Sequence, residues 1–247
     1  NENFQEPYEL ILKYLRIAID YIMTKRRNFI IGAGSTIFTG FYPVVTFAET
    51  ASTYFSLLWR GLDVGFSSIK IKRSGKKVVA NIEVKISVKV LNFDAFSYNL
   101  KNEEVWESGV LKKISSETII GKKVEFVKGI RKKNGFNIDG SKYSGLVEGN
   151  PATTSYFSPE FLKRKTWIST QDGDPLSVSA TKIGPDTAKT ASGEIPATLW
   201  KISGDLDLDL LYGEDGKWLG SRFYAGGSQA EFLLQKSVGN MHSLWKV

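Results

Sequence analysis

VVANIEVKISVKVL, residues Val78–Leu91, alternates apolar and polar side chains through its second half. The apolar side chains of that alternation are Val84, Ile86, Val88 and Val90. Successive side chains of an extended chain point to opposite sides, so all four lie on one face. Alternation over this length predicts a long β-strand with one buried face and one exposed face.

Short turn signals separate further alternating runs along the chain. Dipeptides with a glycine in second place favour the tight turns of β-hairpins, because glycine accepts a positive φ. We therefore expect an antiparallel meander. The predicted turns are Ser74-Gly75 after residues 68–73, Asn134-Gly135 after residues 124–131, and Asp215-Gly216 after residues 206–212.

One stretch favours a helix. Ser158-Pro159-Glu160 has the residues of an N-cap, a first helical position and an acidic first turn, and Phe161–Trp167 is expected to continue for two turns. Thr187–Gly193 is expected to be a polar loop. No strand–helix–strand alternation is present, which argues against a parallel α/β sheet. We predict an all-β protein: a single strongly curved antiparallel sheet or open β-barrel, with one or two short helices.

Composition excludes several functional classes. The 247 residues are 42% hydrophobic and 24% charged, as in a globular protein rather than a disordered or polytopic membrane one. Cysteine is absent, which excludes disulfides, thiolate metal sites and a cysteine nucleophile. The net charge of +7 is spread along the chain, so we interpret it as a solubility feature, with attraction to an anionic surface as the alternative. No nucleic-acid partner, cofactor, metal site or catalytic residue is predicted.

Residues 23–48 resemble a twin-arginine (Tat) signal peptide. Arg26 and Arg27 form the pair, Phe29 lies at the expected aromatic position, and a moderately apolar run ends at a small residue, Ala48. A general secretory signal and a retained membrane anchor are the alternatives. We therefore expect export through the Tat translocase to a periplasm, or membrane anchoring where the signal stays uncleaved.

Residues 1–22 precede this signal and need their own interpretation. Met23 is the expected start codon, which would make 1–22 a translated leader or an artefact of the assigned gene start. The alternative is an amphipathic helix over Tyr8–Ile22 that lies on a membrane. Residues 49–247 are then expected to form one β-rich mature domain.

Short motifs along the mature region resemble an uncharacterised family of exported bacterial proteins, the domain-of-unknown-function family 6134. The resemblance implies an exported β-rich domain and supplies no catalytic residue. The motifs are an early strand with Gly65, then Tyr98, Glu104-Val-Trp106-Glu-Ser-Gly109-Val-Leu111, Ser155-Tyr156-Phe157-Ser158-Pro159, Thr170-Gln-Asp-Gly173, Ile202-Ser-Gly204-Asp-Leu206 and Leu211-Tyr-Gly-Glu-Asp-Gly216-Lys-Trp218.

Three aspartates, Asp205, Asp207 and Asp209, alternate with leucines. On a strand they share one face at about 6.5–7 Å spacing. Ligands of a cation must converge on one point, whereas a straight strand spreads them along a line. A solvated face opposite lysines of a neighbouring strand is therefore the favoured interpretation.

Glu103, Glu104 and Glu107 surround Trp106. Paired carboxylates divide acid and base roles when their environments differ, but no burial is indicated here and no cleft is recognisable. His242 lies in a polar C-terminal tail, where we expect it to be solvated. A hydrolase that uses carboxylates such as Glu104 or Asp207 is therefore the least favoured function.

The aromatic content of 13% allows two interpretations. Aromatic side chains fill sheet cores, and they also line the cavities of ligand-carrying barrels. The favoured hypothesis is an exported, non-catalytic protein that binds a lipid or another apolar ligand in the curved sheet, beside Trp106, Val84, Ile86 and Val88. The alternative is a structural or protein-interaction module of the cell envelope.

Overall fold

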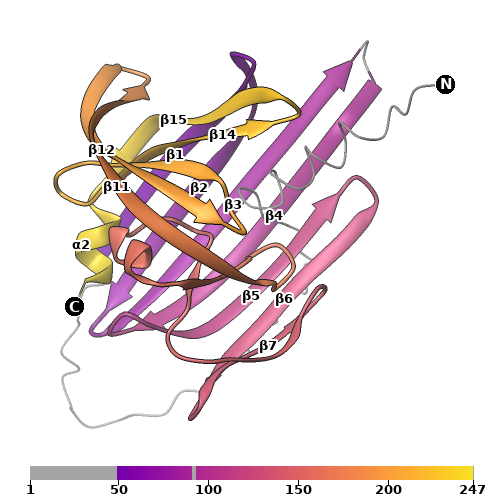
Figure 1. The fold of residues 1–247 in the computed structure, drawn as a ribbon, viewed down its shortest axis with the longest axis vertical. Coiled ribbons are helices and arrows are strands. Elements are labelled where there is room, and N and C mark those ends of the chain that lie inside the picture. Colours follow the sequence, from indigo (N-terminus) through magenta and orange to yellow (C-terminus); the bar gives the residue numbers. More distant parts are fainter. Residues whose placement is uncertain (1–48, 91–92, 247) are drawn as a thin grey trace, which may run out of the picture.

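A computed structural model describes residues 49–90 and 93–246. The predicted leader and signal peptide, including Arg26, Arg27, Phe29 and Ala48, lie outside the described residues. The described chain is a single sheet with the strand order β8-β7-β6-β5-β4-β3-β2-β1-β15-β14-β13-β12-β11-β10-β9 (Figure 1). Its all-β class and strong curvature confirm the prediction from sequence.

The first group of strands is long and forms an antiparallel meander. Each strand pairs with the next along the chain, as expected where two-residue turns connect neighbours. The strands are β1 (Glu49–Trp59), β2 (Leu62–Ser74), β3 (Lys77–Val90), β4 (Phe93–Glu107), β5 (Val110–Ile120), β6 (Lys123–Lys132), β7 (Gly135–Gly140) and β8 (Ser144–Val147).

The second group curls back on itself. Thr190 in β11 bridges Leu234 in β15, so β11 to β15 close into a small ring, while β15 also pairs with β1. In Figure 1, β11 and β12 run across the direction of the long strands. The strands are β9 (Ala152–Thr153), β10 (Thr166–Ile168), β11 (Pro175–Thr190), β12 (Gly193–Gly204), β13 (Leu208–Tyr212), β14 (Trp218–Ala225) and β15 (Ser228–Val238).

Both groups share one hydrophobic core. Alternate residues of β3, including Ile82 and Ile86, are buried on one face, which is the face that the alternation predicts. They belong to the same cluster of buried side chains as Leu208 and Phe232 of the curled group. The curl therefore supplies the apolar cover that the inner face of the long strands needs.

The predicted hairpins form, with their turns shifted by one residue. Ser74 pairs with Lys77 and Lys132 pairs with Gly135, so the turn residues are 75–76 and 133–134. The third connection is a longer loop over 213–217.

Glycine also allows a close approach between strands β2 and β3, because a Cβ on Gly65 would lie 1.9 Å from the carbonyl oxygen of Lys85.

Two expectations need correction. Thr187–Gly193 is not a loop, because β11 continues to Thr190 and turns directly into β12. Its polar side chains face solvent, and Ala188, 1% exposed, faces the core. The predicted helix is a single 3-10 turn, η1 (Pro159–Lys163), capped by Ser158 as expected, and Trp167 already belongs to β10.

A second short helix, α2 (Met241–Trp245), ends the described chain. Asn240 caps it by accepting a hydrogen bond from the backbone N–H of Ser243. Within residues 49–90 and 93–246, no helix has the length and apolarity needed to cross a membrane.

Candidate functional site

Four aromatic rings pack together where the end of β4 meets η1 and α2. They are Trp106, Phe157, Phe161 and Trp245, and we call them the aromatic cluster. The Trp106 ring lies 5.1 Å from that of Phe161 and 5.6 Å from that of Trp245, centroid to centroid. All four side chains are buried. Such ring pairs stabilise a fold beyond the area they bury, so the cluster fastens both helices to the long strands.

Glu104 lies beside this cluster as a completely buried carboxylate. One oxygen accepts from Asn102 Nδ2 at 2.7 Å and from the Ser155 hydroxyl. The other accepts from Trp106 Nε1 at 2.8 Å and from Thr153 Oγ1 at 3.2 Å. Burial raises the pKa of Glu104, and the four donors oppose that rise.

Nothing in the sequence indicated that Glu104 is buried, and the structure corrects this. Its partners at 153 and 155 come from a segment distant in sequence, so the carboxylate ties that segment to β4. Every acceptor position is occupied by a protein donor, and no part of the side chain is exposed. This arrangement suits an anchor, because an acid–base catalyst needs contact with substrate.

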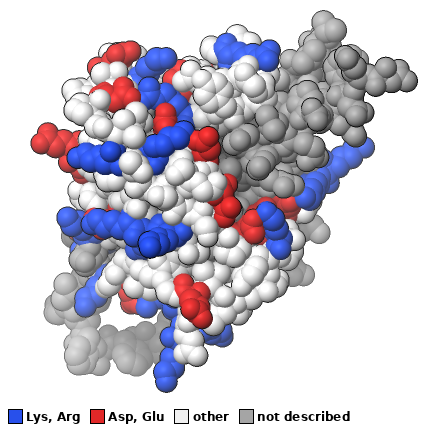
Figure 2. Space-filling model, viewed as in Figure 1, with Lys and Arg blue, Asp and Glu red and all other residues white. Residues whose placement is uncertain are grey.

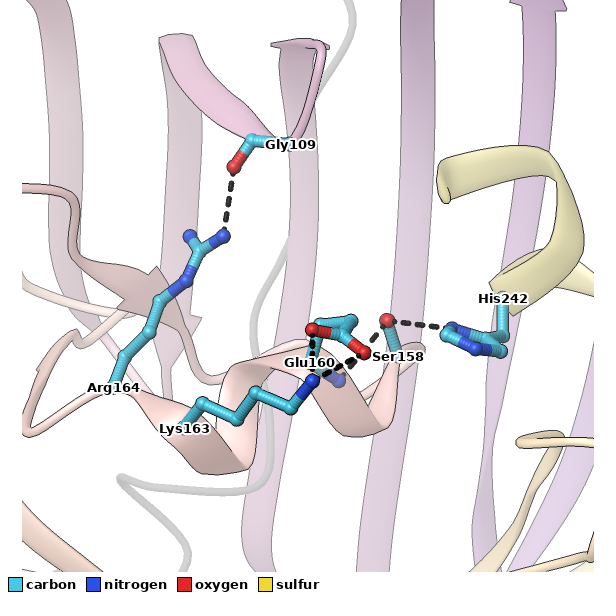
Figure 3. A network of polar contacts seen from close by, with 6 residues as sticks. All are labelled: Gly109, Ser158, Glu160, Lys163, Arg164 and His242. Carbon is cyan, nitrogen blue, oxygen red and sulfur yellow. Dashed lines mark hydrogen bonds and ion pairs between the residues drawn. The ribbon is translucent and has the colours of Figure 1, made fainter. Parts of the chain in front are cut away.

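Arg164 covers the other side of the aromatic cluster. Its guanidinium carbon lies 5.4 Å from the ring centroid of Trp106 and 5.3 Å from that of Trp245. Figure 3 shows it extending from the end of η1 to the carbonyl of Gly109, to which Nη2 donates at 2.7 Å. The Arg164 guanidinium is therefore stabilised by cation–π contacts and by carbonyl dipoles rather than by a carboxylate.

Ser158 links η1 to α2. Its hydroxyl lies 3.0 Å from Nδ1 of His242 and also accepts from the backbone N–H of Glu160 (Figure 3). The Glu160 carboxylate pairs with Lys163 rather than with the imidazole. His242 is half-buried and bonded, so the expectation of a solvated histidine was wrong.

Serine beside histidine invites comparison with a hydrolase, but Ser158 is 0% exposed and serves as an N-cap. A nucleophile must reach its substrate, and this hydroxyl lies beneath packed side chains. Burial lowers the pKa of His242, with Lys246 and Lys163 acting in the same direction and Glu160 and Asp215 opposing them. The pair therefore acts as a neutral contact between two helices.

The aspartates of the C-terminal strands have structural partners. Lys201 of β12 pairs with both Asp207 and Asp209, which confirms the expected lysine partner. The expectation that the three aspartates share one strand face was wrong, because Asp205 and Asp207 precede the start of β13. Asp205 accepts from the backbone N–H of Ser177 at 2.8 Å. In the described part of the chain, no three His, Cys, Asp or Glu side chains group as metal ligands would.

The side chains predicted to bind a lipid lie in or near the core. Val84 is 3% exposed, Ile86 1% and Trp106 0%. Val88 is partly buried and packs against the hydrophobic core. Val84 and Ile86 share the inner face of β3, but packed side chains rather than open space surround them. Lipid binding at these residues stays a prediction.

The outer face of the long strands carries a hollow of about 720 Å³, which spans β2 to β6. We call it the outer hollow. Register pairing aligns its side chains in two rows across the strands. One row is Lys70, Asn81, Glu103, Ser115 and Lys128, and the other is Ser68, Glu83, Lys101, Glu117 and Phe126.

Sequence reasoning missed this surface, because it used the apolar positions of each alternating strand and did not interpret the polar positions between them. The usable signal was the alternation of Glu and Lys at the polar positions of β3, Glu83 and Lys85. It also missed Arg164, which lies in an unbroken basic run, 163–165. Elsewhere the two signs of charge are interspersed, as Figure 2 shows for one face of the molecule.

Comparison with known proteins gives a family and a fold. A family model described as "Domain of unknown function (DUF6134)" matches residues 55–235. A crystal structure of a "Beta-barrel-like Protein of Domain of Unknown Function DUF1849" from Brucella abortus is similar at a TM-score of 0.56 and 10% identity, over 76% of this chain and 97% of that chain. At this identity the likeness concerns the fold alone. No curated protein matches the sequence.

Proposed function

Because the chain belongs to the family described as Domain of unknown function (DUF6134), whose description gives no activity, we propose a function from its own surfaces: a non-catalytic interaction module of the cell envelope. It binds a partner polypeptide through the outer hollow. The observation that carries this proposal is the contrast between a filled inner face and an open, charge-patterned outer face of the same strands.

The chemistry of the outer hollow supports a polypeptide partner. Three lysines and three glutamates alternate along its rows, so a complementary partner presents both signs of charge. Apolar contact is available beside them, because Val124 is 58% exposed in the lining. Ordered rows of opposite charge fix the register of a bound segment, whereas an acyl chain gains nothing from them.

Location outside the cytoplasm is part of the proposal, and it rests on Arg26, Arg27 and the apolar run that ends at Ala48. Replacing both arginines by lysine is expected to abolish export through the Tat translocase. Fractionation of cells that produce either form measures this. Unchanged export of the double variant would overturn the Tat route.

A photo-crosslinking residue at Ser115, in the middle of the outer hollow, tests the binding surface. In intact cells we expect a discrete adduct, and we expect the Glu103→Lys/Glu117→Lys variant to lose it, because one acidic position in each row of the charge pattern is inverted. Glu148→Lys/Glu214→Lys changes the same net charge at exposed positions elsewhere and serves as the control. Absence of an adduct, or equal loss in the control, would refute the proposal.

The lipid hypothesis is tested separately. Native mass spectrometry of the purified protein is expected to show the bare polypeptide mass, because the aromatic cluster and the core fill the inner face. A lipid that co-purifies in stoichiometric amount would favour the lipid carrier over the interaction module.

A further inference from the structure

Two runs of three consecutive basic residues occur in the described part of the chain, 131–133 and 163–165. The first begins near the end of β6, and the second begins at the last residue of η1. Their arginines, Arg131 and Arg164, have no carboxylate ion-pair partner among the described residues. Arg222, another half-buried arginine, is paired with Asp186. This difference needs an explanation.

Both arginines donate hydrogen bonds to the same two segments of the chain, residues 109–111 and residues 149–151. On the first segment, Arg131 Nε donates to the Leu111 carbonyl at 3.1 Å and Arg164 Nη2 donates to the Gly109 carbonyl at 2.7 Å. Gly109 lies in the β4–β5 turn with a φ of 71°, and Leu111 lies at the start of strand β5. The two guanidinium groups therefore contact the chain within three residues of each other, at the start of β5.

The second segment repeats the pattern. Arg131 Nη1 donates to the Gly149 carbonyl at 2.6 Å, and Arg164 Nη1 donates to the Pro151 carbonyl at 2.9 Å. The spacing is again two residues. Two segments thus align the same two cations, which makes their proximity a property of the fold.

Two adjacent like charges are unfavourable unless an anion joins them. Burial lowers the pKa of Arg164 to about 10, and the charge of Arg131 adds to that lowering against the opposing effect of Glu160. Both groups stay cationic at neutral pH. The site therefore carries two positive charges that carbonyl dipoles only partly offset.

Unused donors remain at this site. A guanidinium has five N–H donors, of which three on Arg131 and two on Arg164 donate to acceptors of the described chain. The indole N–H of Trp245, whose ring lies against Arg164, is buried and has no acceptor among the described residues. Neither arginine is fully buried, so a small ligand can reach the pair.

We propose that Arg131 and Arg164 form a binding site for a phosphate-class oxyanion, either free or as the phosphate of a lipid headgroup. A carboxylate has two oxygens and satisfies one guanidinium fork in a bidentate manner, whereas a tetrahedral anion has enough oxygens to bridge two forks. This site lies at the β4–β5 turn, and the proposal stands independently of the outer hollow.

Calorimetric titration of the full chain with sodium phosphate, at constant ionic strength, tests the site. We expect saturable binding that weakens about tenfold or more in Arg131→Gln, because a charge-assisted pair of bonds is lost. Arg164→Lys keeps the charge and loses the fork, and we expect it to weaken binding as well. Arg60→Gln removes an exposed arginine at the opposite end of the long strands and is expected to bind phosphate as the parent does.

Vesicle flotation distinguishes the two sources of phosphate. Binding to vesicles that contain phosphatidylglycerol, lost in Arg131→Gln and absent with phosphatidylcholine alone, identifies a headgroup. Phosphate binding without vesicle binding identifies the free anion. Thermal melts of each variant confirm that it folds. Arg131→Gln is the less disruptive variant, because the ring contact of Arg131 is with Phe136, whereas Arg164 lies against Trp106 and Trp245.

Three results would overturn the proposal. They are the absence of saturable phosphate binding in the parent chain, binding that the Arg131 and Arg164 variants leave unchanged, and an equally strong response to acetate. The last result would show that the site does not select for a tetrahedral anion. A purely structural role for the arginines predicts lower melting temperatures in the variants but no phosphate binding in the parent.

Discussion

Glu104 and Arg164 flank the same tryptophan, and neither has an ionic partner among the described residues. Four neutral donors close around the carboxylate, and nothing of it is exposed. The guanidinium rests on aromatic faces and carbonyls, and it keeps unused donors and partial exposure. The comparison teaches that neutral donors and acceptors can satisfy a buried ionisable group in this fold, and that only the incompletely satisfied group, Arg164, is available to a ligand.

Trp106 contacts both Glu104 and Arg164, so its removal has the largest expected effect on stability. Trp106→Ala deletes a fully buried ring, the donor to Glu104 and the platform for Arg164. We expect a loss of about 4–5 kcal/mol in the free energy of unfolding. Urea denaturation measures it. Trp106→Phe keeps a ring face under Arg164 and removes the N–H, so it should lose clearly less.

Glu104→Ala comes next. It removes the acceptor of four donors, of which only Thr153 Oγ1 has another acceptor among the described residues, Ser155 Oγ, and it opens a cavity. We expect a loss of about 3–4 kcal/mol. Glu104→Gln retains the volume and one acceptor oxygen, and should recover part of the loss. If Glu104→Ala unfolds at the same urea concentration as the parent, the carboxylate is not the anchor described here.

The guanidinium is expected to matter less for stability. Arg164→Gln loses cation–π contact and two carbonyl bonds, and we expect a loss of about 1–2 kcal/mol. The carbonyl of Gly109 keeps a second donor, Asn150 Nδ2, which limits the loss. If Arg164→Gln lowers the free energy of unfolding as much as Glu104→Ala does, the distinction between the fully enclosed Glu104 and the partly exposed Arg164 does not hold.

His242 is expected to give the smallest effect, and one that depends on pH. Its folded pKa lies below the ordinary value of 6.5, so the folded state favours the neutral ring. The folded protein then binds fewer protons than the unfolded chain, and this contribution is lost as pH falls from above 6.5 through the folded pKa. His242→Gln should flatten the decline of stability between pH 7.5 and 5.5. An unchanged slope would contradict the assigned direction.

Local pattern was sufficient where a feature depends on neighbours in the sequence. Alternation in β3 determined which of its residues are buried, since a strand has only two faces. Ser158 and Pro159 determined a helix start because capping is a contact between residues two or three apart. The predicted loop at 187–193 failed because a polar, alanine-containing strand in a small ring resembles a loop when its partners are unknown.

The sequence by itself determined an all-β fold, its hairpins and which strand positions are buried, because these follow from side-chain periodicity and turn residues. The family resemblance rested separately on short motifs along the chain. The tertiary structure alone decided that Glu104 is buried, that Ser158 meets His242, and that Arg131 lies beside Arg164. Those contacts join residues 33 to 84 positions apart or bring a distant segment over β4. No local rule specifies them, because they depend on how far the sheet curls before its two groups of strands share a core.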